Sequence, residues 1–246
     1  MSKPVAGRVA LVTGASRGLG DAAALTLARA GAHVIAVART VGGLEELDDA
    51  IRGAGGSATL TPLDLRDYAG IYRLAAALNE RYGRLDVLVG NAALAGVPSP
   101  LDHIEPKAWD DMMAVNVTAN WHLIRAMDPL LKRSDAGRVV FVTSGIATLA
   151  YAYWAPYSVS KAALDVLART YAAETSSTAV RVNLFSPGAT RTRMRAMAMP
   201  GEDPMTLPAP EQVAEKILDL CLPSFSETGK IYDFRSGKLQ DFARPA

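Results

Sequence analysis

The sequence predicts an α/β protein in which a doubly wound parallel β-sheet carries helices on both faces. Short runs rich in β-branched residues recur along the chain and are separated by longer segments with helical spacing. These short runs are apolar at nearly every position, which is typical of strands buried on both faces of a parallel sheet. The 246 residues are expected to form one domain over 1–246, because single α/β domains often reach this size.

The expected elements follow one another along the chain in this pattern. Strands are predicted at residues 9–13, 34–38, 85–90, 139–144, 180–186 and 231–234, with a weaker strand pattern at 57–63. Helices are predicted at residues 21–30, 68–82, 109–133, 155–174 and 211–222. Residues 194–210 are rich in methionine and proline. We interpret them as a substrate flap, with an ordinary peripheral loop as the alternative.

The composition argues against several classes of function. The chain has 26 Lys and Arg against 25 Asp and Glu, a net charge of +1, so no nucleic-acid partner is expected. His33, His103 and His122 show no metal-ligand spacing, and no metal site is expected. The single cysteine, Cys221, lies in an apolar helical run and is expected to be buried. No apolar run is long enough for a membrane span or a signal segment, so we expect no membrane partner and a cytoplasmic location.

A glycine-rich turn follows the first predicted strand and opens a helix. Residues 13–20 read Thr-Gly-Ala-Ser-Arg-Gly-Leu-Gly. Glycines permit a tight turn and let a pyrophosphate approach backbone N–H groups at the positive end of the helix. Its place between the first strand and the first helix favours a dinucleotide site over a plain strand-to-helix turn. The fold is therefore expected to be of the Rossmann type.

The end of the second predicted strand indicates which nicotinamide dinucleotide is preferred. An NAD-selecting carboxylate is expected there, but no acid occurs between His33 and Glu45. Arg39 occupies this region instead, and Arg17 of the glycine-rich turn supplies a second cation. Two guanidinium groups suit a 2′-phosphate. The sequence therefore predicts NADP(H) rather than NAD(H), with two solvated surface arginines as the alternative.

A tyrosine and a lysine share one face of the predicted helix at 155–174. Tyr157 and Lys161 are four residues apart, so their side chains lie one helical turn apart. A phenol with an ordinary pKa near 10 is a poor acid–base group at neutral pH, but a nearby ammonium stabilises its phenolate. The spacing makes Tyr157 a candidate proton donor to a carbonyl or acceptor from an alcohol. Taken alone, the same spacing is common on helices and usually has no functional meaning.

These features together resemble the short-chain dehydrogenase/reductase family. The resemblance rests on the turn at 13–20, on the pair Tyr157 and Lys161, on Ser144 at the end of a predicted strand and on Asn116 in the preceding helix. It covers residues from about 8 to 192, and its motifs occur in the family's order.

The resemblance implies a role for each of four catalytic residues. Tyr157 would be the general acid–base, and Lys161 would hold the nicotinamide ribose and lower the pKa of the tyrosine. Ser144 would hydrogen-bond the substrate oxygen, and Asn116 would anchor a water of a proton relay through its backbone. Taken alone, Ser144 could equally cap a strand and Asn116 could bond its neighbours.

The resemblance also implies which residues hold the cofactor. Asp64 would contact the adenine edge, unless it is a plain turn residue, and Asn91 would line the adenosine ribose. Residues 187–192 would hold the nicotinamide amide and the pyrophosphate. The full set is Gly14, Ser16, Arg17, Gly18, Leu19, Gly20, Arg39, Asp64, Leu65, Asn91, Ala92, Tyr157, Lys161, Pro187, Gly188, Thr190 and Thr192.

Two positions depart from the family pattern. The family often reads Asn-Asn-Ala-Gly where residues 90–93 read Gly-Asn-Ala-Ala, so a structural side-chain bond at position 90 is lost. Residues 229–237 also lack the Asp-Gly-Gly ending common in the family. This second departure puts a particular subunit contact in doubt.

The leading hypothesis is an NADP(H)-dependent oxidoreductase that acts on a ketone, an aldehyde or a secondary alcohol. The alternatives are a 3-ketoacyl reductase acting on carrier-bound acyl chains and a non-catalytic NADP(H)-binding sensor or scaffold. Tyr151, Tyr153 and Trp154 suggest an aromatic wall for an apolar substrate, or else a subunit contact. The resemblance further implies a homodimer or homotetramer formed through the helices at 109–133 and 155–174.

Overall fold

The computed structural model describes residues 3–149 and 151–242 and confirms the doubly wound α/β architecture. The described residues form one sheet in the order β3-β2-β1-β4-β5-β6-β7-β8. Its strands are β1 Val9–Thr13, β2 His33–Ala38, β3 Ser57–Pro62, β4 Val87–Gly90, β5 Arg138–Val142, β6 Arg181–Ser186, β7 Ile231–Asp233 and β8 Lys238–Gln240. All neighbours pair in parallel except β7 and β8, which form an antiparallel pair.

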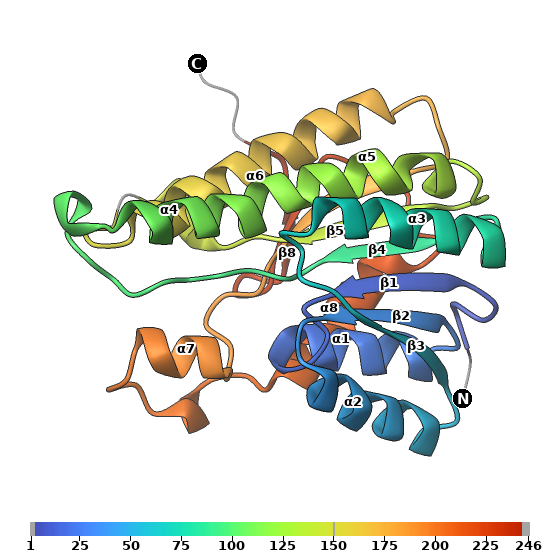
Figure 1. The fold of residues 1–246 in the computed structure, drawn as a ribbon, viewed down its shortest axis with the longest axis horizontal. Coiled ribbons are helices and arrows are strands. Elements are labelled where there is room, and N and C mark those ends of the chain that lie inside the picture. Colours follow the sequence, from blue (N-terminus) through green and yellow to red (C-terminus); the bar gives the residue numbers. More distant parts are fainter. Residues whose placement is uncertain (1–2, 150, 243–246) are drawn as a thin grey trace.

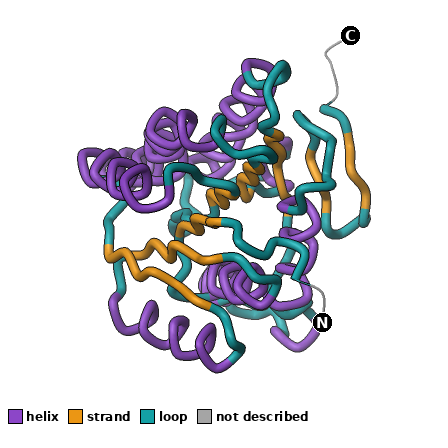
Figure 2. The backbone as a smooth tube through the Cα atoms, turned by 90° about the vertical axis from the view of Figure 1, so that its right-hand side faces the viewer, coloured by secondary structure: helices purple, strands orange, loops and turns teal. Residues whose placement is uncertain are grey.

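Helices cover both faces of the sheet (Figure 1). One layer holds α3 Tyr68–Tyr82, α4 Pro106–Met113, α5 Ala119–Leu131 and α6 Ala155–Glu174. The other holds α1 Gly18–Arg29, α2 Val41–Gly53 and α8 Pro210–Cys221, while α7 Arg193–Ala198 lies apart from both layers. Figure 2 shows the strands between these layers, with the last two strands at the side near the C-terminus.

The core lies on both sides of the sheet, as the continuous apolar runs predict. In β1, Ala10 and Val12 pack in the cluster that includes α1 and α8. Val9 and Leu11 pack in the cluster that includes α3, α5 and α6. Successive side chains of a strand point to opposite faces, so every residue of β1 is buried.

The strand order reverses at β1, which pairs with both β2 and β4. The connections that leave the carboxyl ends of β1 and β4 therefore diverge to opposite faces of the sheet. In open α/β sheets this divergence opens the crevice in which ligands bind. The predicted site residues follow the carboxyl ends of β1 to β6, except Asn116, Tyr157 and Lys161, which lie in helical segments.

The opposite end of the sheet is held by a buried acid. Asp86 is fully buried and accepts hydrogen bonds from the Val9 backbone N–H at 2.9 Å and from Ser134 Oγ at 2.6 Å. Arg8 and Arg84 pair with the same carboxylate at 3.2 and 3.1 Å. These contacts hold the N-terminal ends of β1, β4 and β5 together, at the end of the strands opposite to the predicted site.

Three elements differ from the sequence prediction. The helix α2 was not expected, although Leu44, Leu47 and Ile51 bury one face of it, because two glycines at its start obscure the pattern. The short exposed strand β8 has no apolar alternation. The helix expected over 109–133 is three segments, since α4 and α5 flank a π-helical turn at Ala114–Thr118.

Candidate active site

The glycine-rich turn between β1 and α1 has the backbone conformation that its sequence predicts. Gly14 and Gly18 adopt positive φ angles of 68° and 60°, which side chains other than glycine rarely adopt. At Gly20 a Cβ atom would lie 2.2 Å from the Gly14 carbonyl oxygen. The turn can therefore close on itself only with glycine at these positions, and it leaves backbone N–H groups at the start of α1.

Thr13 and Asn91 join this turn to the loop after β4. Thr13 Oγ1 accepts hydrogen bonds from the backbone N–H groups of Asn91 at 3.0 Å and Ala92 at 3.1 Å, and it donates to the Val89 carbonyl at 3.3 Å. Asn91 Nδ2 donates to the Thr13 carbonyl at 3.0 Å. The loops after β1 and β4, which diverge to opposite faces of the sheet, are thus held side by side.

Two arginines stand exposed beside this turn. Arg17 and Arg39 are exposed, and no ion pair found in residues 3–149 and 151–242 engages either of them. Ser16 and Thr40, their neighbours in sequence, approach within 3.4 Å through their hydroxyl oxygens. The glycine-rich turn and the end of β2 therefore lie together, and both cations remain available to an anionic group.

Asp64 lies in the loop after β3 and is already engaged by a cation. Arg66 Nη2 pairs with Asp64 Oδ2 at 2.7 Å, and the same guanidinium reaches Asp111 at 3.0 Å. Hydrogen bonding to Arg66 lowers the pKa of the Asp64 carboxyl, and the charge of Arg39 adds to this effect. The neighbouring Leu65 is buried. The Asp64 carboxylate is thus charged at neutral pH and held in place by Arg66.

Asn116 is fully buried in the π-helical turn. Its Oδ1 accepts from the Leu94 N–H, and its Nδ2 donates to the Leu94 carbonyl and to Ser160 Oγ at 2.8 and 2.9 Å. Its backbone carbonyl accepts from Asn120 Nδ2 at 2.8 Å. The Asn116 side chain thus links the loop after β4 to α6, and the π turn, a feature frequent at functional sites, was not predicted.

Ser144 and Tyr157 come together from different elements. Ser144 is the second residue after β5 and caps a 3₁₀ turn at Gly145–Thr148. Tyr157 lies in the first turn of α6. Burial raises the pKa of the Tyr157 phenol, and hydrogen bonding to Ser144 acts in the opposite direction. The prediction that Lys161 lowers the pKa of Tyr157 is therefore wrong in this structure, because burial has the larger influence. It keeps the phenol protonated, which is the form that donates a proton.

Lys161 is buried one turn further along α6. The residue is 2% exposed, and its Nζ donates to the Val142 carbonyl at 2.7 Å. The Nζ atom lies 5.8 Å from the centre of the Tyr157 ring. Burial lowers the pKa of Lys161 to about 8, while the charge of Asp165 opposes this shift. The ammonium thus lies beside the phenol, as the helical spacing predicts.

The segment after β6 returns to the glycine-rich turn. Thr190 is buried, and its hydroxyl donates to the Pro187 carbonyl at 3.3 Å. Thr192 caps α7 by accepting from the Arg195 N–H at 3.2 Å. A Cβ atom added at Gly18 would lie 3.5 Å from the Thr192 side chain. The segment that leads into the predicted flap therefore lies directly beside the predicted pyrophosphate site.

The chain before α6 adopts a strained conformation. Among the described residues, Tyr153 is the one non-glycine residue with a positive φ, at 72°, a conformation that raises the free energy of an L-residue by about 1 kcal/mol or more. Its carbonyl accepts from the Ser99 N–H at 2.9 Å. This bond ties the loop after β4 to the segment that leads into α6.

The predicted flap has some regular structure of its own. It contains α7 and a 3₁₀ turn at Pro204–Thr206, and Arg195 pairs with Glu202 at 2.6 Å. The Arg191 N–H donates to the Pro208 carbonyl at 3.0 Å and closes the segment at its base. Its four methionines are all exposed.

The glycine at position 90 has a structural explanation. A Cβ atom there would lie 2.3 Å from Phe141 Cδ1 and 2.9 Å from Asn120 Oδ1. Gly90 pairs with Phe141 across β4 and β5, and Phe141 is fully buried. The ring of Phe141 therefore fills the space that a side chain at position 90 would need.

Two buried polar residues near the site were not predicted. Asp165 lies one turn after Lys161 on α6, and Ser160 receives the Asn116 amide and donates to the Tyr157 carbonyl at 2.8 Å. The four-residue spacing from Lys161 could have indicated Asp165. Nothing in the local sequence indicates the partner of Ser160, because Asn116 lies 44 residues away.

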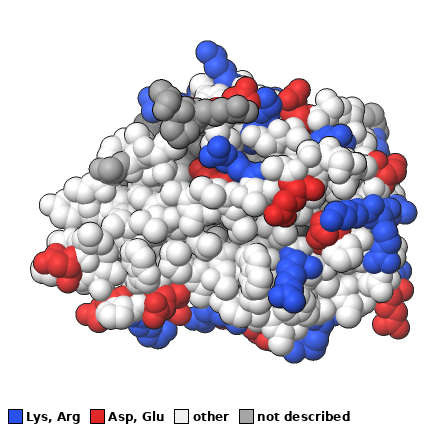
Figure 3. Space-filling view, turned by 90° about the horizontal axis from the view of Figure 1, so that it is seen from above, with Lys and Arg blue, Asp and Glu red and all other residues white. Residues whose placement is uncertain are grey.

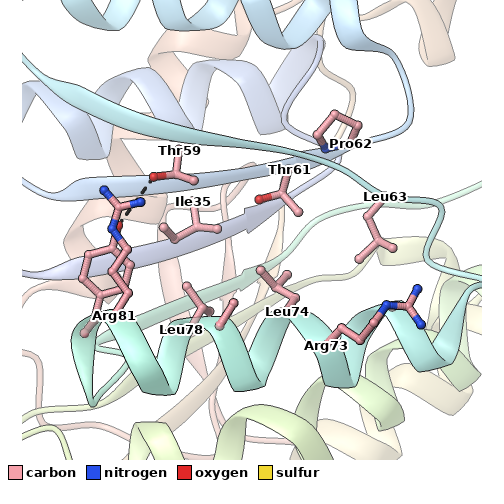
Figure 4. A pocket seen from close by; sticks show the side chains of 12 residues that line it. Ile35, Thr59, Thr61, Pro62, Leu63, Arg73, Leu74, Leu78 and Arg81 are labelled. Atoms are coloured by element: carbon pink, nitrogen blue, oxygen red, sulfur yellow. Dashed lines mark hydrogen bonds between the residues drawn. The ribbon is translucent and has the colours of Figure 1, made fainter.

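A cavity of about 410 Å³ lies elsewhere, between β3 and α3. Figure 4 shows Leu74 and Leu78 of α3 facing Thr59 and Thr61 of β3 across it. None of the predicted site residues lines this cavity. Within the described residues, no group of His, Cys, Asp and Glu side chains could hold a metal ion, and no helix is long and apolar enough to cross a membrane.

Comparison with known proteins finds similar sequences and similar structures. The family model for short chain dehydrogenase matches residues 8–203. The uncharacterized oxidoreductase YciK of Escherichia coli strain K12 is 38% identical over 235 residues, which are 94% of this chain and 93% of the relative. A short chain dehydrogenase of Shigella flexneri crystallised with NADP has a TM-score of 0.91 at 37% identity, covering 95% of this chain and 99% of the other. A short chain dehydrogenase of Escherichia coli CFT073 crystallised with NADPH has a TM-score of 0.88 at 37% identity, with the same coverage.

Proposed function

The chain belongs to the short-chain dehydrogenase family and is an oxidoreductase, and from this premise we propose that it reduces a carbonyl group, or oxidises the corresponding alcohol, with NADP(H). The observation that carries the proposal is the convergence of Ser144, Tyr157 and Lys161. The phenol is half-buried beside a serine hydroxyl and a buried ammonium. This arrangement suits proton transfer to a carbonyl oxygen.

The residues at the carboxyl ends of β1 and β2 fit NADP(H). The glycines at 14, 18 and 20 leave a turn that no Cβ atom fills, and the start of α1 offers backbone N–H groups to a pyrophosphate. Arg17 and Arg39 would hold the 2′-phosphate, since both are exposed beside the turn. The two NADP(H)-bound neighbours support the same cofactor.

The acid–base chemistry follows from the side chains of this chain. When bound, NADPH supplies the hydride. Tyr157 donates its phenolic proton to the carbonyl oxygen, and Ser144 donates a hydrogen bond to that oxygen. The Lys161 ammonium stabilises the phenolate left behind. Asn116 holds the loop after β4 against α6 and offers its backbone carbonyl to the water that returns the proton.

The rim of the site favours an apolar substrate. Exposed large hydrophobic side chains gather on the loop after β4, on the segment before α6 and on the flap. They are Val97, Leu101, Leu149, Tyr151, Tyr153, Met194, Met197, Met199 and Met205. Exposed apolar surface that is contiguous often marks a ligand-binding groove or a protein contact. We therefore expect an apolar or ring-containing carbonyl, with the methionines adapting to its shape.

The experiment that tests this function compares NADPH and NADH oxidation over a panel of carbonyls. The panel includes 2-alkanones of increasing length, aromatic ketones, sugars and acyl thioesters. We expect NADPH-dependent reduction that rises with chain length and falls at least 100-fold in Tyr157→Phe. Tyr72→Phe, a remote and exposed tyrosine on α3, is the control and should retain activity. Binding of NADPH with no turnover of any carbonyl or alcohol would contradict the proposal and favour a sensor.

The cofactor preference has a separate test. Arg39→Ala should weaken NADPH binding about tenfold or more and leave NADH binding nearly unchanged, because only NADPH carries the 2′-phosphate. Fluorescence titration of both cofactors measures this. Arg29→Ala, an arginine at the other end of α1, controls for a general loss of positive charge. Equal weakening of both cofactors would refute the assignment.

We also propose that the chain forms a homodimer or homotetramer through α5 and α6. Trp121 of α5 and Val159 and Val166 of α6 are 42%, 43% and 59% exposed. In Figure 3, which views the molecule from the side of these helices, a broad part of the surface is uncharged. Val166→Glu should reduce the mass measured by sedimentation, whereas Val41→Glu, at a valine on α2 that is 50% exposed, should not. An unchanged mass in Val166→Glu would refute this interface.

A further inference from the structure

Asp165 is a buried carboxylate that the proposed chemistry does not use. Tyr157, Lys161 and Asp165 follow one another at four-residue intervals, so they lie along one side of α6. Asp165 is 6% exposed. Burial of a carboxylate is unfavourable unless other groups compensate for its lost hydration. Its neighbours therefore indicate what it does.

Asp165 faces the same strand end as the catalytic residues. Thr143 Oγ1 donates a hydrogen bond to Asp165 Oδ1. Thr143 is itself held in the sheet, because its N–H donates to the Phe185 carbonyl at 2.8 Å. The adjacent Val142 carbonyl accepts from Lys161, and Ser144 follows directly. Three consecutive residues at the end of β5 thus meet this side of α6.

The charges of Lys161 and Asp165 also compensate each other. Burial lowers the pKa of Lys161 to about 8, and the Asp165 carboxylate opposes that shift. Burial raises the pKa of Asp165 to about 6, and Thr143, Lys161 and Arg169 oppose it. The charged groups acting on this carboxylate are thus Lys161 and Arg169 on α6, and β5 contributes the Thr143 hydroxyl. Both side chains are charged at pH 7, where each makes the burial of the other less unfavourable.

We propose that Asp165 is a positioning residue for the acid–base pair: its carboxylate keeps the buried Lys161 ammonium charged and, through Thr143, holds α6 against the strand end that carries Ser144. This inference rests on the proposed roles of Tyr157 and Lys161. It assigns to α6 a third functional side chain, one that acts through its neighbours and does not touch the substrate.

The test removes the charge and keeps the shape. Asp165→Asn has nearly the same volume and retains an oxygen that can accept from Thr143. The titration of Lys161 is followed by NMR in the cofactor-free protein labelled with ¹³C at lysine Cε, with Lys161→Met to assign the signal. We expect the Lys161 midpoint to move down by about one pH unit. NADPH affinity and reductase activity should also begin to decline at a correspondingly lower alkaline pH.

A matched control distinguishes the loss of the Asp165 charge from a general loosening of α6. Asp128 of α5 also binds α6, because it accepts from the Tyr171 hydroxyl at 2.9 Å. Asp128→Asn should lower the melting temperature and leave the Lys161 midpoint unchanged. If Asp165→Asn does not fold, Asp165→Ser removes the same charge.

Two results would overturn the proposal: an unchanged Lys161 midpoint in the Asp165 variants, or an equal shift in Asp128→Asn. The NMR titration needs neither substrate nor cofactor. It therefore distinguishes failure of this inference from failure of the proposed oxidoreductase activity, which the carbonyl panel tests separately.

Discussion

Gly90 and Phe141 are expected to be energetically coupled, because the Phe141 ring occupies the space that a side chain at position 90 would need. In Gly90→Ala the new Cβ atom would lie 2.3 Å from Phe141 Cδ1 and 2.7 Å from Cε1, so the ring must move by about 1 Å to reach ordinary contact. Phe141 is fully buried. Overpacking of this kind destabilises a core by about 1–3 kcal/mol, and the upper part of that range is expected here.

Phe141→Val removes the two clashing ring atoms. Alone it leaves a cavity and should destabilise the protein by about 2–3 kcal/mol. In the double variant Gly90→Ala/Phe141→Val the alanine methyl group enters the space that the ring has left. Its free energy of unfolding should therefore fall by about 1–2 kcal/mol less than the sum of the decreases in the two single variants.

The assay is equilibrium denaturation in urea, followed by circular dichroism at a fixed protein concentration. Gly53→Ala is the matched control, because nothing lies within 4 Å of a Cβ atom at that last residue of α2. It should be neutral or slightly stabilising. Additive losses within about 0.5 kcal/mol, or a Gly90→Ala variant as stable as the parent, would refute the packing explanation.

Four further predictions concern the site and the core. Asp86→Ala should lower the free energy of unfolding by about 3–5 kcal/mol, because it leaves two arginines and a buried N–H without their acceptor; a loss below about 1 kcal/mol in urea denaturation would contradict this. Gly20→Ala should abolish NADPH binding in a fluorescence titration while circular dichroism stays unchanged, since its Cβ atom would lie 2.2 Å from the Gly14 carbonyl oxygen. Carbonyl reduction should fall as the pH rises through about 8, because the lowered pKa of Lys161 means that its charge, present below that pH, is lost above it; a rate that stays level to pH 10 would count against the assignment. Burial raises the pKa of the Cys221 thiol to about 12, so dithionitrobenzoate at pH 8 should label it only after unfolding, and rapid labelling of the native protein would show the burial to be wrong.

Much of the fold was predictable from local patterns. The alternation of strands and helices depends on side-chain periodicity, which each segment carries by itself. Periodicity fails where a local feature masks it. In α2, Gly42 and Gly43 stand where a helix former is expected, yet Gly43 is needed because its Cβ atom would lie 2.7 Å from the Ser16 carbonyl oxygen.

The candidate site divides in the same way. The turn at 13–20 and the pair of Tyr157 and Lys161 are short-range motifs, whose geometry follows from turn chemistry and helical spacing. The bond between Thr143 and Asp165 joins residues 22 positions apart, and no local spacing predicts it. The π turn that carries Asn116 is also invisible in the sequence, because the contacts that stabilise it lie in α6 and in the loop after β4.

The sequence by itself therefore determined the α/β class, the family resemblance and the candidate residues for proton transfer and cofactor binding. Only the tertiary structure decided the strand order, the filling of the space beside Gly90 and the environment that raises the pKa of Tyr157 and lowers that of Lys161. The physical reason is the distance along the chain over which each interaction acts. Periodicity and turn conformation act over a few residues, whereas burial and the meeting of buried polar groups depend on segments far apart in the chain.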